Sequence, residues 1–255
     1  MKKIIGLALL IIVLLCSCSG RVARTDEAAH EKEGYDSNRS VLYSAKGHFN
    51  NGAETDPVVV FSEKTNDEYN TQKLILEVDV NDKAFYCEIG EFPSAIFRDG
   101  VLILADFDEN GSDEVFISTS VNPNMVRVNR IYRLAPTGWE LLQDLDEYDP
   151  EFIFEFKENR SITLSNKDGT ISIDVDISHF SDEAFDSDGK YNIGYDTSLI
   201  YGNLFSCELT DDNKISAVGS IKDSYMNRWG LFRYTFEYDK DLSQMHIIDT
   251  EYVGP

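Results

Sequence analysis

The chain is a succession of short apolar segments, and this pattern restricts the folds that it can adopt. From residue 40 onward, runs rich in Val, Ile, Phe and Tyr alternate with clusters of Asp, Asn, Gly and Ser, and no window has a sustained helical period. Many short strands separated by turn residues are typical of an antiparallel all-β domain. We therefore expect one all-β domain over residues 40–255, with strands at 57–62, 73–80, 84–89, 100–105, 114–121, 126–134, 139–144, 152–156, 161–165, 170–177, 198–208, 214–221, 230–238 and 245–252.

The stretch DFDENGSDE, between two of these apolar runs, is the clearest chemical signal in the chain. A hard cation such as Ca²⁺ needs several oxygen ligands at about 2.3 to 2.6 Å. Gly at the sixth position permits the sharp turn that would gather such ligands around one point. The predicted ligands are the side chains at the first, third, fifth and ninth positions and the main-chain carbonyl at the seventh, namely Asp106, Asp108, Asn110, Glu114 and Ser112.

Two other interpretations of this stretch compete with a calcium loop. An EF-hand places a bidentate Glu at position twelve, but Ile117 occupies that position and the flanking segments read as strands, so the EF-hand is excluded. A solvated acidic hairpin is the simpler alternative, because Asn110-Gly111 is a strong turn signal by itself. Three converging carboxylates would repel one another without a cation, which favours calcium.

The strand-loop-strand form of this stretch resembles the calcium loop of FG-GAP and VCBS repeats. That resemblance implies a structural Ca²⁺ at a sheet corner and β-propeller-like blades, with a β-sandwich as the alternative fold. A degenerate second copy follows the run 198–205, and Asn213 there takes the place of the turn glycine. This copy has lost strong ligands at two positions, so we expect no metal at Glu208, Thr210, Asp212 and Ser216.

The N-terminus predicts export and lipid attachment. Two lysines precede an apolar run from Ile4 to Leu15 that is too short for a permanent membrane span. The sequence Leu15-Cys16-Ser17-Cys18 resembles a bacterial lipobox, with Cys18 as the acylated residue. We expect residues 1–17 to be a lipoprotein signal peptide. The mature protein would then be held on the extracytoplasmic face of a cell membrane by two acyl chains, which suffice for stable anchoring.

Residues 18–39 contain almost no large apolar side chain and mix Gly, Ser, Glu, Asp and Arg without a period. Such a segment cannot bury enough surface to offset the entropy of ordering it. We expect a flexible tether between the lipid and the β domain.

The net charge of −23 excludes nucleic acid as a partner. A surface of this sign repels phosphate backbones, and the chain has no cluster of Lys and Arg to overcome the repulsion. The partners that remain open are an unidentified protein or a glycan.

Two cysteines fall inside predicted strands, Cys87 in AFYCEI and Cys207 in LFSCEL. An exported protein can form disulfides, and a bridge between these residues would close a long loop. Alternation in the strands is equally compatible with two buried free thiols. The sequence leaves both alternatives open.

No catalytic centre is visible in the sequence. The four histidines are far apart, and the chain has no GxSxG motif, no P-loop and no dinucleotide-binding glycine pattern. We predict a non-catalytic, calcium-stabilised binding module on a lipoprotein. A cell-envelope polysaccharide or peptidoglycan hydrolase is one alternative, and a purely structural accessory lipoprotein is the other.

Overall fold

The structure is a computed structural model that describes residues 21–24, 38–49, 55–121, 127–148, 150–179, 185–189, 200–222 and 228–255. This part of the chain is all-β without a helix, and every strand pair in it is antiparallel, as the sequence predicts. None of its elements is a helix of the length and apolar character that a membrane span requires. The predicted signal peptide, Cys18 and residues 25–37 lie outside the described residues.

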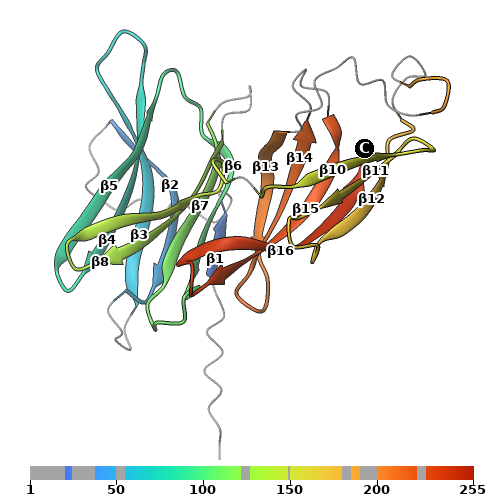
Figure 1. Cartoon of the computed structure of the whole chain (residues 1–255). Coiled ribbons are helices and arrows are strands. Elements are labelled where there is room, and N and C mark those ends of the chain that lie inside the picture. The colour runs from blue at the N-terminus through green and yellow to red at the C-terminus, as the bar shows by residue number, and fades with distance from the viewer. Residues whose placement is uncertain are drawn as a thin grey trace, which may run out of the picture.

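The strands form four sheets (Figure 1). The N-terminal sheet contains β2 (Arg39–Gly47), β3 (Asp56–Lys64), β4 (Gln72–Val80) and β5 (Lys83–Phe92). The central sheet has the order β1 (Arg21–Arg24), β6 (Arg98–Ala105), β7 (Glu114–Ser120), β8 (Arg127–Ala135) and β9 (Gly138–Asp144). The small sheet contains β10 (Ile153–Lys157), β11 (Ser161–Ser165) and β12 (Ser172–Asp176). The C-terminal sheet contains β13 (Ile200–Leu209), β14 (Ile215–Lys222), β15 (Arg228–Asp239) and β16 (Gln244–Gly254).

Apart from β1, each sheet is a meander of strands that follow one another in the chain. Turn residues explain this local order. Asn81 and Asp82, between β4 and β5, both have positive φ angles of 51° and 60°. Asn and Asp tolerate this conformation, which the tight turns of antiparallel hairpins require. The turn clusters seen in the sequence therefore connect neighbouring strands.

The inner strands β6 and β7 of the central sheet are buried on both faces. Along β6, Leu102 and Leu104 pack into a core shared with the N-terminal sheet, whereas Ile103 packs into a second core shared with the small and C-terminal sheets. The same alternation continues on β7, where Phe116 and Ile117 are both fully buried in different cores. Successive side chains of a strand point to opposite faces, so these continuous apolar runs fill two cores at once.

Strand β1 corrects part of the tether prediction. Residues 21–24 pair antiparallel with β6, with Val22 opposite Ile103. The prediction rested on the absence of large apolar side chains, but strand pairing uses backbone N–H and C=O groups that every non-proline residue carries. The exposed edge of β6 offers such groups, and the chain that precedes the domain pairs with them.

The two cysteines do not form a disulfide. Both are free thiols, Cys87 half-buried and Cys207 buried. Cys87 packs against the core between the N-terminal and central sheets, whereas Cys207 belongs to the core on the other side of the central sheet. Of the two alternatives that the sequence left open, the structure has the free thiols, because the central sheet separates the two side chains.

Candidate metal centre

The stretch Asp106 to Glu114 is the hairpin loop between β6 and β7, as predicted. Ala105 and Glu114 are paired at the base of the hairpin. Within the loop, Glu109 and Gly111 have positive φ angles of 58° and 89°. The φ angle of Gly111 is the larger of the two and lies in a backbone region that residues other than Gly rarely adopt.

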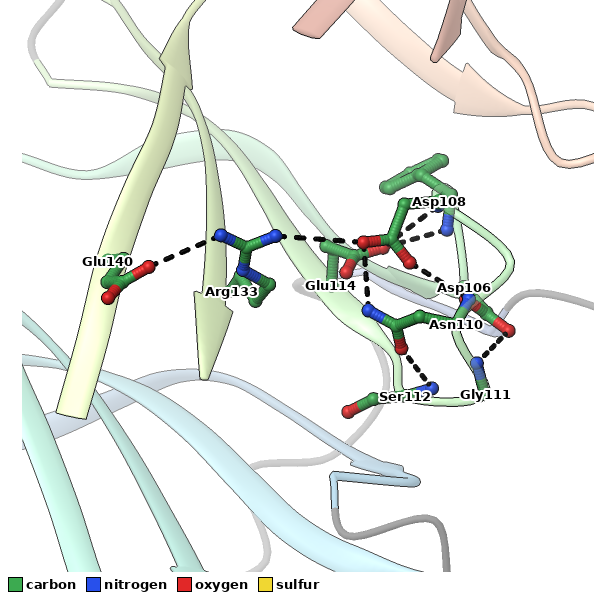
Figure 2. Close-up of polar contacts among 9 residues, drawn as sticks. Asp106, Asp108, Asn110, Gly111, Ser112, Glu114, Arg133 and Glu140 are labelled. Carbon is green, nitrogen blue, oxygen red and sulfur yellow. Dashed lines mark hydrogen bonds and ion pairs between the residues drawn. The ribbon is translucent and has the colours of Figure 1, made fainter. Parts of the chain in front are cut away.

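Three of the five predicted ligand residues come together. The carboxylates of Asp106, Asp108 and Glu114 each offer an oxygen, and these oxygens all lie within 4.8 Å of one another. Two ligands that are each about 2.4 Å from one Ca²⁺ can be at most about 4.8 Å apart. The spacing therefore fits a single cation, and Figure 2 shows the loop with the contacts of these side chains.

Backbone N–H groups hold two of these carboxylates in place. Asp106 Oδ1 accepts a hydrogen bond from Asn110 N at 2.8 Å, and Asp106 Oδ2 accepts one from Gly111 N at 2.9 Å. Asp108 Oδ1 accepts from Asn110 N at 3.0 Å. The loop is thus wrapped around its own carboxylates, which preorganises them for binding.

Glu114 is the most deeply buried of the three acids, with no exposed surface. Its Oε2 atom accepts hydrogen bonds from Phe107 N at 2.8 Å and from Asp108 N at 3.4 Å. Its Oε1 atom is buried and has no hydrogen-bond partner. A buried polar atom that lacks a partner costs about 1 to 3 kcal/mol, and a charged group costs more.

Two of the clustered carboxyl groups have raised pKa values, because they are buried beside other acids. Burial first, and then the charge of Asp108, raises the pKa of Glu114 to about 8. Burial also raises the pKa of Asp106, with further contributions from Asp108 and Asp113. A divalent cation among these groups would favour their charged forms and reverse both shifts.

The guanidinium group of Arg133 on β8 contacts one carboxylate of the cluster. Its Nη1 atom lies 3.7 Å from Asp108 Oδ2, and its Nη2 atom lies 3.3 Å from Glu140 Oε2 on β9 (Figure 2). The arginine is shared between two acids and reaches only one of the three clustered carboxylates. An ion pair of this length at a partly exposed site contributes about 0 to 1 kcal/mol and leaves the buried Glu114 uncompensated.

Asn110 and Ser112 lie in the loop, but their side chains face differently from the prediction. The amide nitrogen of Asn110, and not its oxygen, faces the cluster, because Nδ2 donates to Asp108 Oδ2 at 2.8 Å and Oδ1 accepts from Ser112 N at 2.8 Å. In this structure the side-chain oxygen of Asn110 is therefore an acceptor within the loop. For Ser112 the sequence predicts a ligand role of the main-chain carbonyl. The Ser112 side chain does not face the cluster, because its hydroxyl donates to His48 O at 3.3 Å.

Asp113 supports the loop and is not among the residues that the sequence predicts for the site. Asp113 Oδ2 accepts from His48 N at 2.8 Å, and Asp113 N donates to His48 O at 2.7 Å. This double contact ties the loop to the segment after β2. A Cβ atom on Gly47 would lie 2.9 Å from Asp113 Oδ2, so the close approach depends on that glycine. No local sequence pattern indicates the contact between Asp113 and His48, because 65 positions separate the two residues.

The loop also contacts the C-terminal sheet. Lys240, in the turn between β15 and β16, forms an ion pair with Glu109. This contact joins residues that are 131 positions apart. Both side chains are more than half exposed, so the pair contributes little to stability.

The second loop, between β13 and β14, has a lysine where the first has converging acids. Lys214 Nζ lies 2.8 Å from Asp212 Oδ2. Thr210 Oγ1 is 2.6 Å from Asp212 Oδ1, and Asn213 has the positive φ angle of 57° that the alignment with Gly111 predicts. The two loops share a hairpin plan, but in the second the Lys214 ammonium group pairs with the Asp212 carboxylate inside the loop.

Comparisons with protein-family models, with curated proteins and with solved structures find no match to this chain. The resemblance to FG-GAP and VCBS repeats therefore stays a prediction from the loop and its flanking strands.

Proposed function

We propose that the β6–β7 loop binds one Ca²⁺ ion and that this ion stabilises the fold without taking part in chemistry. The observation that carries the proposal is Glu114, whose fully buried carboxylate has an unpartnered Oε1 atom beside Asp106 and Asp108. A cation at this position would supply the missing partner and remove the repulsion among the three acids.

Calcium is the ion that suits this donor set best. Every candidate ligand is an oxygen, and the cluster of described acids includes no His or Cys, the ligands that zinc prefers. Ca²⁺ accepts six to eight oxygens in flexible geometry, whereas Mg²⁺ requires a strict octahedron and retains several waters. A loop that supplies three carboxylates and its own carbonyls fits the larger ion.

We further propose that the chain is a lipid-anchored, extracytoplasmic module whose surface binds a protein or glycan partner. The lipobox ending at Cys18 and the apolar run before it support the anchor. We propose that the sheets are propeller-like blades, because apart from β1 each is a meander of consecutive strands and the central sheet packs between its neighbours.

Calcium titration of thermal unfolding tests the metal proposal. A free concentration ten times the dissociation constant should stabilise the protein by about 1.4 kcal/mol. For a chain of this size that raises Tm by about 3 to 6 °C. Asp108→Ala should lose this rise, whereas Asp212→Ala, the matched change in the second loop, should retain it. An equal calcium shift in Asp108→Ala and wild type would show that the loop is only a turn.

Fractionation of cells tests the anchor. Wild type should sediment with membranes and be released by detergent, and Cys18→Ser should appear in the soluble extracytoplasmic fraction because no thiol remains to carry lipid. Cys16→Ser is the control and should stay with the membrane. Membrane retention of Cys18→Ser would contradict the anchor.

A further inference from the structure

A cavity of about 490 Å³ lies between the central and C-terminal sheets, and the metal proposal does not use it. Its wall includes Gly100, Ser118 and Arg127 from the central sheet and Phe205 and Val218 from the C-terminal sheet. The loop that binds the proposed ion joins β6 and β7 after Ala105, whereas the cavity is lined by the opposite end of that hairpin. The volume is in the range of small-molecule sites.

The guanidinium group of Arg127 is held in this cavity by two acceptors. Its Nη2 atom donates to Asp99 O at 3.2 Å and to Ser118 Oγ at 3.4 Å. The Ser118 hydroxyl in turn donates to Asn129 Oδ1 at 2.7 Å, which leaves its lone pairs toward the arginine. The side chain is therefore oriented by neutral groups.

The backbone at Asp99 and Gly100 is shaped for this contact. The pairing of β6 with β7 shifts register between Arg98 and Val101, and Asp99 has a φ angle of 46°. Gly100 leaves no room for a side chain, because a Cβ atom there would lie 2.5 Å from Ser118 O. Bulges of this kind redirect backbone groups and are common beside binding sites. Here the bulge presents the Asp99 carbonyl to Arg127.

Arg127 lacks a carboxylate partner within the described residues. Among the other described arginines, Arg39, Arg130 and Arg133 each form an ion pair with Asp or Glu. Arg233, which also lines the cavity, is paired with Glu251. The Nε atom of Arg127 is buried and has no hydrogen-bond partner. The chain has 46 acidic and 23 basic residues, and yet this cavity-lining arginine has an unmet donor and no ion pair among the described residues. That combination indicates an anion from outside the chain.

The remaining wall defines the chemistry of that anion. Val101, Phe205 and Val218 offer apolar surface beside the arginine, which suits an organic body. The charged lining is mixed: Asp99 and Glu208 line the cavity together with Arg127 and Arg233, and the second arginine is already paired with Glu251. One free guanidinium beside two acids favours a monoanion over a dianion. A carboxylate is a planar monoanion that an arginine fork binds through two parallel hydrogen bonds.

We propose that this cavity binds a small organic carboxylate, with Arg127 as the anion-binding residue and the apolar side chains around the body of the ligand. The site is separate from the calcium loop, so ligand binding should be the same with Ca²⁺ and with chelator. It gives the module a small-molecule ligand in addition to any macromolecular partner.

Isothermal titration of the full chain with benzoate, benzamide and inorganic phosphate tests this site. Benzoate should bind with a dissociation constant on the order of 1 mM, as expected for a fragment. Benzamide has the same shape without the charge and should bind at least about tenfold weaker, a loss of about 1.4 kcal/mol. Preference for phosphate over benzoate, or no binding of benzoate, would overturn the carboxylate assignment.

Variants locate the binding. Arg127→Gln should weaken benzoate binding at least about tenfold, whereas Arg39→Gln, which alters an arginine of the N-terminal sheet, should not. Val218→Trp fills the cavity and leaves Arg127 intact, so it should also abolish binding and carries the test if Arg127→Gln does not fold. Benzoate binding that survives both Arg127→Gln and Val218→Trp would place the ligand elsewhere and refute the proposal.

Discussion

Glu114 is the most deeply buried acid of the proposed calcium loop. It is fully buried, it accepts two backbone hydrogen bonds on one oxygen, and it has none on the other. A polar atom in this state opposes folding unless something compensates it. The position therefore favours a proton when no metal is bound and a cation when one is.

The pH dependence of stability should reveal this competition. The pKa of about 8 for Glu114 in the folded chain is above its ordinary value of 4.5. Between these pH values the folded state holds a proton that the unfolded state has released. The free energy of unfolding of the metal-free protein should therefore fall as pH rises from about 4.5 to about 8.

Urea unfolding in chelator over this pH range measures the effect. Glu114→Gln cannot titrate and should show a flatter dependence than wild type. Glu155→Gln, at an exposed position on β10, should keep the wild-type slope. If Glu114→Gln and wild type have the same slope, Glu114 does not hold a proton in the folded state.

At the scale of the element, backbone N–H groups of the β6–β7 hairpin hold the carboxylates of Asp106 and Asp108, two of the proposed calcium ligands. Gly111 has a φ angle of 89°, and its N–H donates to Asp106. A side chain at this position would strain the turn and move the carboxylate that the turn holds. The position of the Asp106 carboxylate therefore depends on the backbone conformation of the turn at Gly111.

A pair of glycine substitutions separates strain from metal binding. Gly111→Ala should destabilise the protein by about 1 kcal/mol or more and weaken calcium binding. Gly169, in the turn between β11 and β12, has a φ angle of 74° and open space around its Cα. Gly169→Ala should have a similar cost in stability without a change in calcium affinity, as calcium titration of both variants would show. Equal calcium affinity in the two variants would contradict the role of Gly111.

At the scale of the whole molecule, the central sheet connects the two cores. Phe116 and Ile117 are neighbours on β7, both with no exposed surface, and they belong to different cores. Strand β7 contributes side chains to both cores, so loss of packing on one face of the sheet also disturbs the other face. We expect the two cores to unfold together.

Alanine substitutions on the two faces test this coupling. Phe116→Ala should cost about 3 to 5 kcal/mol and Ile117→Ala about 2 to 5 kcal/mol. Each variant should still unfold in a single transition that coincides by circular dichroism and by fluorescence. Ile153→Ala, at an exposed position, should change stability by no more than about 0.5 kcal/mol. Two separated transitions in either core variant would show that the cores are independent.

Local patterns carried most of the correct predictions about strands and turns. The runs on either side of Asp106 form β6 and β7, and Gly111 and Asn213 have the positive φ angles that their hairpins need. These features depend on neighbouring residues alone, because side-chain alternation and turn conformation are set within a few positions. The convergence of Asp106, Asp108 and Glu114 follows from the same short stretch.

Contacts between distant residues were decided only by the tertiary structure. The sequence could not show that residues 21–24 pair with β6, that Asp113 binds the backbone of His48, or that a sheet separates Cys87 from Cys207. Backbone pairing leaves no side-chain pattern, and the packing of one sheet on another depends on many weak contacts at once. For the same reason the cavity around Arg127 appeared only when two sheets far apart in the chain were placed face to face.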